Sequence, residues 1–219
     1  MSLAFLHTAP ANVDTFRRLV AEIDPSTAAE HLVLEQVLAG AVGSGAVTDA
    51  MRLDTEAAIR GLAAVGATLV VCTCSTIGGV AEEAAVPGVH VMRIDRPMAE
   101  QAVASGRRIL VAATLPSTLR PTLALIREIA ATASRNVDLA ELLCAEAWVH
   151  FEHGHRDAYA EAIASAVAAA ARPDDLVVLA QASMAPAAER LRGRGIEALA
   201  SPELGVRTAL DLFHRRPRI

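Results

Sequence analysis

A cysteine followed by two hydroxyl residues stands directly after a strongly apolar segment. The segment Ala67–Cys72 is continuous and rich in β-branched residues, and Cys74, Ser75 and Thr76 follow it. This pattern predicts a buried strand that leads into a helix. A helix N-terminus stabilises negative charge and can lower the pKa of a thiol, so Cys74 is a candidate acid–base group. Ser75 and Thr76 can cap the helix, and their hydroxyls can hold a substrate carboxylate.

The other two cysteines have a simpler interpretation. Cys72 lies within the predicted strand and Cys144 stands alone, so we expect both to be small core residues. A Cys-x-Cys metal site at Cys72 and Cys74 would need a second ligand pair, which the sequence lacks. Three cysteines fit a reducing compartment better than a disulfide scaffold.

The chain repeats its own pattern. Leu69–Cys74 (LVVCTC) is echoed 107 residues later by Leu176–Gln181 (LVVLAQ), and Thr8–Pro10 is echoed 106 residues later by Thr114–Pro116. Two similar halves are therefore predicted, with two apolar strands that end face to face. One strand delivers the thiol of Cys74 and the other the amide of Gln181, on two sides of one substrate.

Polar residues also recur at the predicted helix starts. Thr8 and Thr114 occupy equivalent positions, as do Asn12 and Thr118. These side chains can act as N-caps, and around a cleft they can also bind an anion. His7 ends the first predicted strand, where it is either a polar lining residue or an acid–base group.

Strand and helix signals alternate along the whole chain. The predicted strands are Leu3–Leu6, Leu32–Leu34, Ala67–Cys72, Val89–Ile94, Ile109–Ala113, Val137–Leu142, Leu176–Ala180 and Ile196–Leu199. The predicted helices are Asn12–Ile23, Thr48–Val65, Thr76–Ala85, Pro97–Ser105, Ser117–Ala131, Asp157–Ala171, Ala182–Arg192 and Glu203–Phe213, and Gly40–Gly45 is predicted to be a loop.

This alternation predicts an α/β fold with parallel sheets and right-handed crossovers. In such folds ligands bind outside the carboxyl ends of the strands. We expect a first lobe from residues 1–96 plus 203–219 and a second from residues 97–202. The functional residues are then expected at Leu6–Thr8, Cys72–Thr76, Ala113–Thr118 and Ala180–Ser183.

Composition excludes several classes of protein. The sequence has 219 residues, is 53% hydrophobic and has a net charge of −5 with no basic tract, so we expect no nucleic-acid partner. No apolar run approaches the roughly 20 residues that span a bilayer. The N-terminus has no basic region before Pro10, so we expect no signal peptide and a cytoplasmic location. We also expect a homo-oligomer.

The chain contains no lysine. This excludes a Walker A lysine and a pyridoxal-phosphate Schiff base, and no G-x-G-x-x-G follows a predicted strand. We therefore expect chemistry without a cofactor. The segment from Trp148 to His155 holds three histidines, but their spacing matches no ligand pattern, so we predict a solvated loop and no metal.

Three motifs resemble those of the aspartate/glutamate/hydantoin racemase superfamily. Cys74–Thr76 resembles the family's first signature, Cys-Asn-Thr, and Ala113–Thr114 with Thr118 resembles its mid-chain threonine segment. Leu176–Pro186 (LVVLAQASMAP) is similar to the second signature by position, although its cysteine is absent. The resemblance covers nearly the whole chain.

This resemblance implies two pseudo-symmetric α/β lobes with parallel sheets flanked by helices and no cofactor. In the family one cysteine removes the proton α to a carboxylate and the other returns a proton to the opposite face. Carried over by position, Cys74 takes the role of the first cysteine and Gln181 stands in place of the second. The implied substrate-binding residues are Thr8, Asn12, Ser75, Thr76, Thr114, Thr118, Ala182 and Ser183.

A glutamine exchanges no proton near neutral pH, so the reaction itself stays open. The first hypothesis is an isomerase acting on a small carboxylate-bearing acid, with Cys74 and a partner such as His7, Ser183 or water. The second is a single-cysteine decarboxylase or lyase, in which one protonation at carbon suffices. The third is a small-acid binding protein that has lost catalysis.

Overall fold

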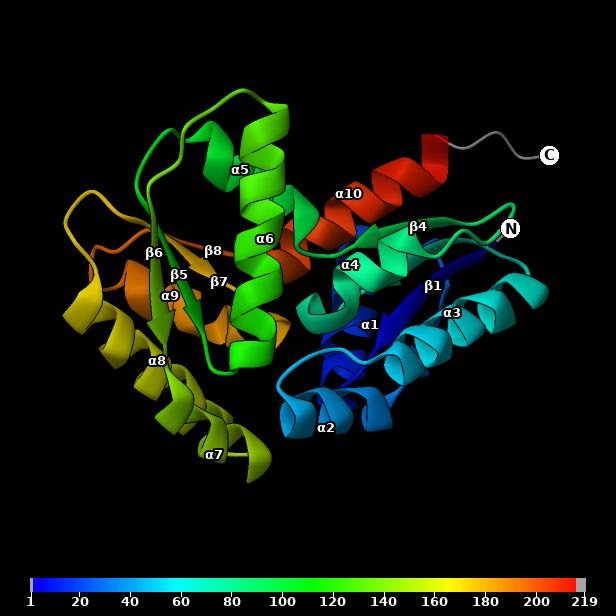
Figure 1. Cartoon of the computed structure of the whole chain (residues 1–219), viewed down its shortest axis with the longest axis horizontal. Coiled ribbons are helices and arrows are strands. Elements are labelled where there is room, and N and C mark those ends of the chain that lie inside the picture. The colour runs from blue at the N-terminus through cyan, green and yellow to red at the C-terminus, as the bar shows by residue number, and fades with distance from the viewer. Residues whose placement is uncertain (1, 216–219) are drawn as a thin grey trace. The chain divides into compact units, whose positions relative to one another are not determined.

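The computed structural model describes residues 2–215, which form two compact units (Figure 1). Unit 1 takes the residues up to Ile94 together with those from Pro202 onward, and unit 2 spans Asp95–Ser201. The last helix of the chain therefore belongs to the unit built by the N-terminal half.

Unit 1 is built on a four-stranded parallel sheet with the order β2-β1-β3-β4. Its strands are β1 (Ser2–His7), β2 (Ala29–Val33), β3 (Ala67–Cys72) and β4 (His90–Arg93). The central strands β1 and β3 are almost entirely buried, as expected for a parallel sheet covered on both faces. Leu6 pairs with Cys72, so these two strands end side by side.

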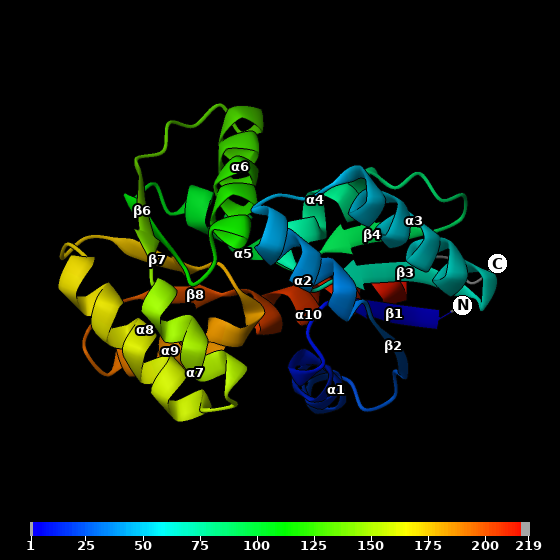
Figure 2. The same cartoon turned by 60° about the horizontal axis from the view of Figure 1, so that its bottom comes forward.

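Helices cover both faces of the unit 1 sheet. They are α1 (Ala11–Ile23), α2 (Glu35–Ser44), α3 (Asp49–Ala64), α4 (Ser75–Glu83) and α10 (Ser201–Arg215). One face packs against α2, α3 and α4 through a cluster that includes Ala4, Leu6, Val70 and Cys72. Phe5 instead contacts Phe16 of α1, and Figure 2 shows α1 and α3 on opposite sides of the sheet. Because side chains alternate along a strand, His7 and Thr73 lie on the α1 face.

Unit 2 repeats this plan with the strand order β6-β5-β7-β8, again all parallel. Its strands are β5 (Ile109–Ala113), β6 (Leu139–Leu143), β7 (Leu176–Leu179) and β8 (Ala198–Ala200). Each strand of unit 1 thus has a counterpart in the same place of the unit 2 sheet. The expected α/β fold, with two similar parallel-sheet units flanked by helices, is confirmed.

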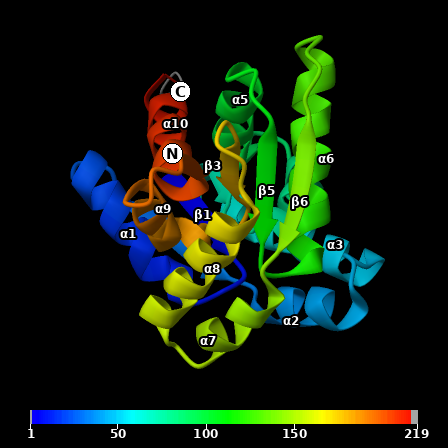
Figure 3. The ribbon, with the colours of Figure 1, turned by 90° about the vertical axis from the view of Figure 1, so that its left-hand side faces the viewer.

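The helices of unit 2 also cover both faces of its sheet. They are α5 (Arg96–Ala104), α6 (Pro116–Thr132), α7 (Trp148–Glu152), α8 (Arg156–Ala170) and α9 (Ala185–Arg192), with short 3₁₀ turns at Ala145–Ala147 and Ala182–Met184. The helices α8 and α9 share one core with β5 and β7. Figure 3 shows α6 on the opposite side of β5 from α8.

Three sequence predictions about local structure are wrong. The loop predicted at Gly40–Gly45 is instead the C-terminal half of α2, which ends where Gly45 takes a left-handed φ of 71°. The loop predicted from Trp148 to His155 contains α7. The helix predicted at Ala182–Arg192 is split into a 3₁₀ turn and α9, because Pro186 follows the turn and favours a new helix start.

Candidate functional site

Cys74 lies where β3 ends and α4 begins. It is the N-cap residue of α4, with an extended backbone at φ −105° and ψ 112°. Its side chain is half-buried, whereas Cys72 and Cys144 are buried in the cores of their units. Burial also raises the pKa of the Cys144 thiol to about 11. Of the three cysteines, Cys74 is thus the one that solvent and a ligand can reach.

Ser75 and Thr76 are the first two residues of α4, and both are buried. Neither caps the helix, because the N-cap position belongs to Cys74, which makes no side-chain capping bond. The predicted capping role of Ser75 or Thr76 is therefore wrong. The first-turn N–H groups of α4 still lie next to Cys74, where they favour negative charge.

His7 is the last residue of β1 and is fully buried. Its Nδ1 lies 2.8 Å from Thr73 Oγ1, and its Nε2 lies 2.9 Å from Nδ1 of His31 in β2. Both ring nitrogens are therefore engaged within unit 1. His31 was not singled out from the sequence, and Thr73 was included only as part of the expected functional segment Cys72–Thr76.

Thr8 and Asn12 flank the start of α1. Thr8 is buried directly after β1, and Asn12 is the half-buried second residue of the helix. The N-cap is Pro10, which makes no side-chain capping bond, so the predicted capping by these two residues is wrong. The helix begins at Ala11, two residues before the start that an Asn12 cap would give, and Pro10 already has a helical φ of −55°.

In unit 2 the ends of β5 and β7 are joined by a threonine and a glutamine. Gln181 Oε1 accepts from the Thr114 backbone N–H at 2.6 Å and from the Thr114 hydroxyl at 2.9 Å. A backbone N–H only donates, so it is the amide oxygen of Gln181 that faces Thr114. Among the residues that the structure describes, none hydrogen-bonds the Gln181 Nε2 group.

A buried tyrosine extends this arrangement. The Tyr159 hydroxyl lies 3.3 Å from Thr114 Oγ1 and 3.0 Å from Ser183 Oγ. Since the Thr114 proton is used on Gln181, Thr114 must accept from Tyr159, and Tyr159 must accept from Ser183. Burial, which outweighs these two hydrogen bonds, raises the pKa of Tyr159, so the phenol stays protonated and keeps donating. Sequence reasoning missed Tyr159, which lies in α8.

The start of α6 carries two further candidate residues. Its N-cap is Leu115, with no side-chain capping bond, so the predicted capping by Thr114 and Thr118 is wrong, and the Thr114 hydroxyl is directed to Gln181 instead. Thr118 is buried in the first turn. Beside it, the buried Ser117 hydroxyl has no hydrogen-bond partner among the described residues.

Ala182 is buried, in the 3₁₀ turn that follows Gln181, and Ser183 is half-buried in the same turn. The structure thus brings together Thr114, Gln181 and Ser183 in unit 2. In unit 1 it brings together His7 and the Thr73–Cys74 turn.

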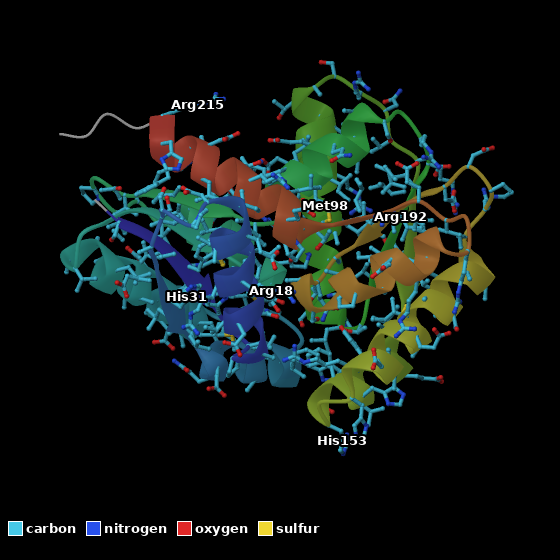
Figure 4. All side chains as sticks on the ribbon, turned by 180° about the vertical axis from the view of Figure 1, so that it is seen from behind. Arg18, His31, Met98, His153, Arg192 and Arg215 are labelled. Carbon is cyan, nitrogen blue, oxygen red and sulfur yellow. The ribbon has the colours of Figure 1, made fainter. Side chains whose placement is uncertain are left out.

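The histidine-rich segment has no metal-site geometry. His153 hydrogen-bonds the Val149 carbonyl at 2.7 Å, and Figure 4 labels it at the end of α7. Within residues 2–215, no group of three or more His, Cys, Asp or Glu side chains is placed to hold a metal ion. Nor is any helix in that range long and apolar enough to cross a membrane.

No protein-family model matches the sequence, and no curated protein matches it. Solved structures do match across nearly the whole chain. The aspartate racemase of Picrophilus torridus is 12% identical, with a TM-score of 0.72 over 100% of this chain and 96% of its own. A glutamate racemase from Thermus thermophilus, solved in complex with β-chloro-D-alanine, is 19% identical. Its TM-score is 0.72, over 97% of this chain and 80% of its own.

The allantoin racemase of Klebsiella pneumoniae is 16% identical, with a TM-score of 0.62 over 98% of this chain and 88% of its own. The chain therefore has the same fold as these aspartate, glutamate and allantoin racemases. At such low identity the similarity establishes the fold alone. The chemistry must be argued from the residues at the strand ends.

On this racemase fold the two units carry different strand-end groups. Unit 1 offers the Cys74 thiol beside a helix start, and unit 2 offers the Gln181 amide held by Thr114. A thiol exchanges protons, whereas an amide only donates and accepts hydrogen bonds. The two units are alike in topology and unlike in chemistry.

Proposed function

We propose that the chain is a cofactor-independent isomerase that acts at the carbon α to a carboxylate of a small acid. Cys74 is the acid–base group, and Gln181 occupies the position of the second cysteine. The observation that carries this proposal is the half-buried Cys74 thiol at the N-cap of α4, on a racemase fold. Named structural neighbours of this fold act on aspartate, glutamate and allantoin.

The orientation of Gln181 supports a binding role. Because its oxygen is engaged by Thr114, the amide presents N–H donors, which suit a carboxylate or carbonyl oxygen. Ser75, Thr76 and Thr118 are further candidates to bind the carboxylate, since all three lie in first turns of helices. Thr8, Asn12, Ala182 and Ser183 complete the proposed substrate-binding set.

The absence of a proton-transfer group on Gln181 favours a second candidate. A decarboxylase or lyase needs one protonation at carbon, which a single thiol can supply. This reaction uses the same residues in the same roles. A protein that binds a small acid without turnover is the third alternative.

Deuterium incorporation distinguishes these functions. The chain is incubated in heavy water with amino acids, hydantoins and dicarboxylates, and the carbon bearing the labile proton is followed by NMR. An isomerase incorporates deuterium with inversion, and a decarboxylase incorporates it with loss of carbon dioxide. Absence of incorporation for ligands that raise the melting temperature would contradict an enzymatic function.

A further inference from the structure

Two histidines of unit 1 form a hydrogen-bonded pair that ends on Thr73, the residue before the candidate thiol. His31 Nδ1 lies 2.9 Å from His7 Nε2, and His7 Nδ1 lies 2.8 Å from Thr73 Oγ1. The Thr73 hydroxyl in turn donates to the Leu6 carbonyl at 3.2 Å. Thr73 directly precedes Cys74, so the chain of bonds reaches the turn that presents the thiol.

The direction of this chain is fixed by its last member. The only proton of the Thr73 hydroxyl is used on Leu6, so Thr73 Oγ1 must accept from His7 Nδ1–H. A neutral His7 then has a bare Nε2, which accepts from His31 Nδ1–H. Both imidazoles are therefore Nδ1–H tautomers, with donors that run from His31 to His7 to Thr73.

The surroundings keep the pair neutral. His7 is fully buried and contacts the rings of Phe16 and His31, and His31 is half-buried and stacks on Phe5. Burial, followed by the charge that His31 can carry, lowers the pKa of His7 to about 3.

His31 has charged neighbours on two elements. Burial and then Arg17 of α1 lower its pKa, whereas Glu30 of β2 acts in the opposite direction. The chain of hydrogen bonds is lost only when His7 binds a second proton at Nε2, which takes strongly acidic conditions.

The backbone makes the same connection. The Thr73 N–H also donates to the Leu6 carbonyl, at 2.9 Å, so the end of β1 holds Thr73 through both its backbone and its side chain. Cys74 follows with an extended backbone and begins α4. The orientation of Thr73 therefore controls where the Cys74 side chain starts.

We propose that His31 is a positioning residue for the reaction at Cys74. Through its donor to His7 it selects the tautomer that orients Thr73, and Thr73 fixes the turn that carries the thiol. This inference rests on the proposed role of Cys74. By the same argument His7 is a positioning residue too, because both of its ring nitrogens are hydrogen-bonded to Thr73 and His31. Figure 4 labels His31.

The first test reads the tautomers and needs no substrate. Nitrogen-15 NMR of the imidazoles, with His31→Asn and His7→Asn used for assignment, is expected to show both rings as Nδ1–H tautomers at neutral pH. His7 is expected to stay neutral down to about pH 4. An Nε2–H tautomer of His7 would overturn the proposal. Binding of one zinc ion by both rings would overturn it too, because ring nitrogens that bind a metal cannot make these hydrogen bonds.

The second test compares two substitutions of His31. In His31→Asn the amide nitrogen stands near the place of Nδ1 and can still donate to His7, whereas in His31→Leu the apolar volume is kept and the donor is lost. We expect His31→Leu to change the rate of Cys74 alkylation by iodoacetamide roughly threefold or more, and His31→Asn to stay near wild type. Circular dichroism checks that both variants are folded.

With a substrate found by deuterium incorporation, kcat should fall roughly 10- to 100-fold in His31→Leu, with KM little changed. His31→Asn should retain most of kcat. Equal behaviour of the two variants, in alkylation and in kcat, would overturn the positioning role and leave the role of Cys74 standing. Failure of the proposed function would look different. Wild type would then show no turnover, although the tautomers and the alkylation rates would still be as expected.

Discussion

The orientation of the Gln181 amide follows from one backbone donor. The Thr114 N–H donates to the side-chain oxygen at 2.6 Å and cannot accept a hydrogen bond, so the amide cannot be turned over without loss of that bond. Thr114 and Gln181 were both candidates from the sequence, because each follows a predicted strand and recurs in the internal repeat. Tyr159 could not be found in this way, since its place depends on how α8 packs on that sheet.

The first prediction concerns the order of thiol reactivity. Cys74 is half-buried at a helix start, and Cys72 and Cys144 are in apolar cores. Iodoacetamide at mildly acidic pH, followed by mass spectrometry of the peptides, should therefore label Cys74 well before the other two. Equal labelling of all three thiols in the folded protein would contradict this order.

The second prediction concerns the Tyr159 hydroxyl. Tyr159→Phe keeps the buried ring but leaves Thr114 without its donor and Ser183 without its acceptor, so the free energy of unfolding should fall by about 1 kcal/mol. Ser183→Ala removes only the outer, half-buried member and should cost less. Urea denaturation measures both. A larger loss in Ser183→Ala than in Tyr159→Phe would show that the chain of donors is wrongly assigned.

At the scale of elements, buried strands were the easiest to predict. Ala67–Cys72 and Ile109–Ala113 match the observed strands residue for residue, because a short continuous apolar run bounded by turns has few other solutions. The segment Gly40–Gly45 was mispredicted because glycine is a weak helix former, yet packing of Val37 and Ala41 keeps α2 helical until Gly45. Tertiary burial overrides local propensity there.

The pairing of His7 with His31 was also hidden from the sequence. The strand predicted at Leu32–Leu34 begins one residue too late to include His31. In the observed register His31 lies opposite Phe5, which makes it a diagonal neighbour of His7 on the same face. Strand pairing is a long-range property, so no local sequence pattern predicts this contact.

The third prediction concerns the packing of α10 in unit 1. A Cβ on Gly205 would lie 2.5 Å from the Ile94 backbone oxygen, so Gly205→Ala forces the helix away from Ile94 and should cost about 1–3 kcal/mol. The matched control is Gly61→Ala on the exposed face of α3, where a Cβ meets nothing within 4 Å. That variant should gain up to about 1 kcal/mol, because alanine is the better helix former.

Thermal and urea unfolding compare the two glycine variants directly. Helix propensity alone would make both substitutions stabilising. A stabilising Gly205→Ala would therefore show that α10 does not pack closely against Ile94.

At the scale of the whole molecule, one topology is used twice with different chemistry at its strand ends. Both units have a four-stranded parallel sheet with the corresponding strand order, and each fixes a strand-end turn through a directed chain of hydrogen bonds. The chain of unit 1 runs to Thr73, the residue before Cys74, and that of unit 2 ends on the Gln181 amide. The sequence repeat predicted the duplicated topology but not these chains, which also depend on His7, His31, Tyr159 and Ser183, outside the repeated motifs.

The division of labour between Cys74 and Gln181 is the central claim, and exchange at the α-carbon tests it most directly. Deuterium incorporation from heavy water is followed by NMR on one substrate for wild type, Cys74→Ala, Gln181→Cys and the core control Cys144→Ala. We expect the exchange rate of Cys74→Ala to fall about 10²–10⁴-fold and that of Cys144→Ala to stay at the wild-type value. Gln181→Cys should gain racemisation through its second thiol. Exchange at the wild-type rate in Cys74→Ala would contradict the account.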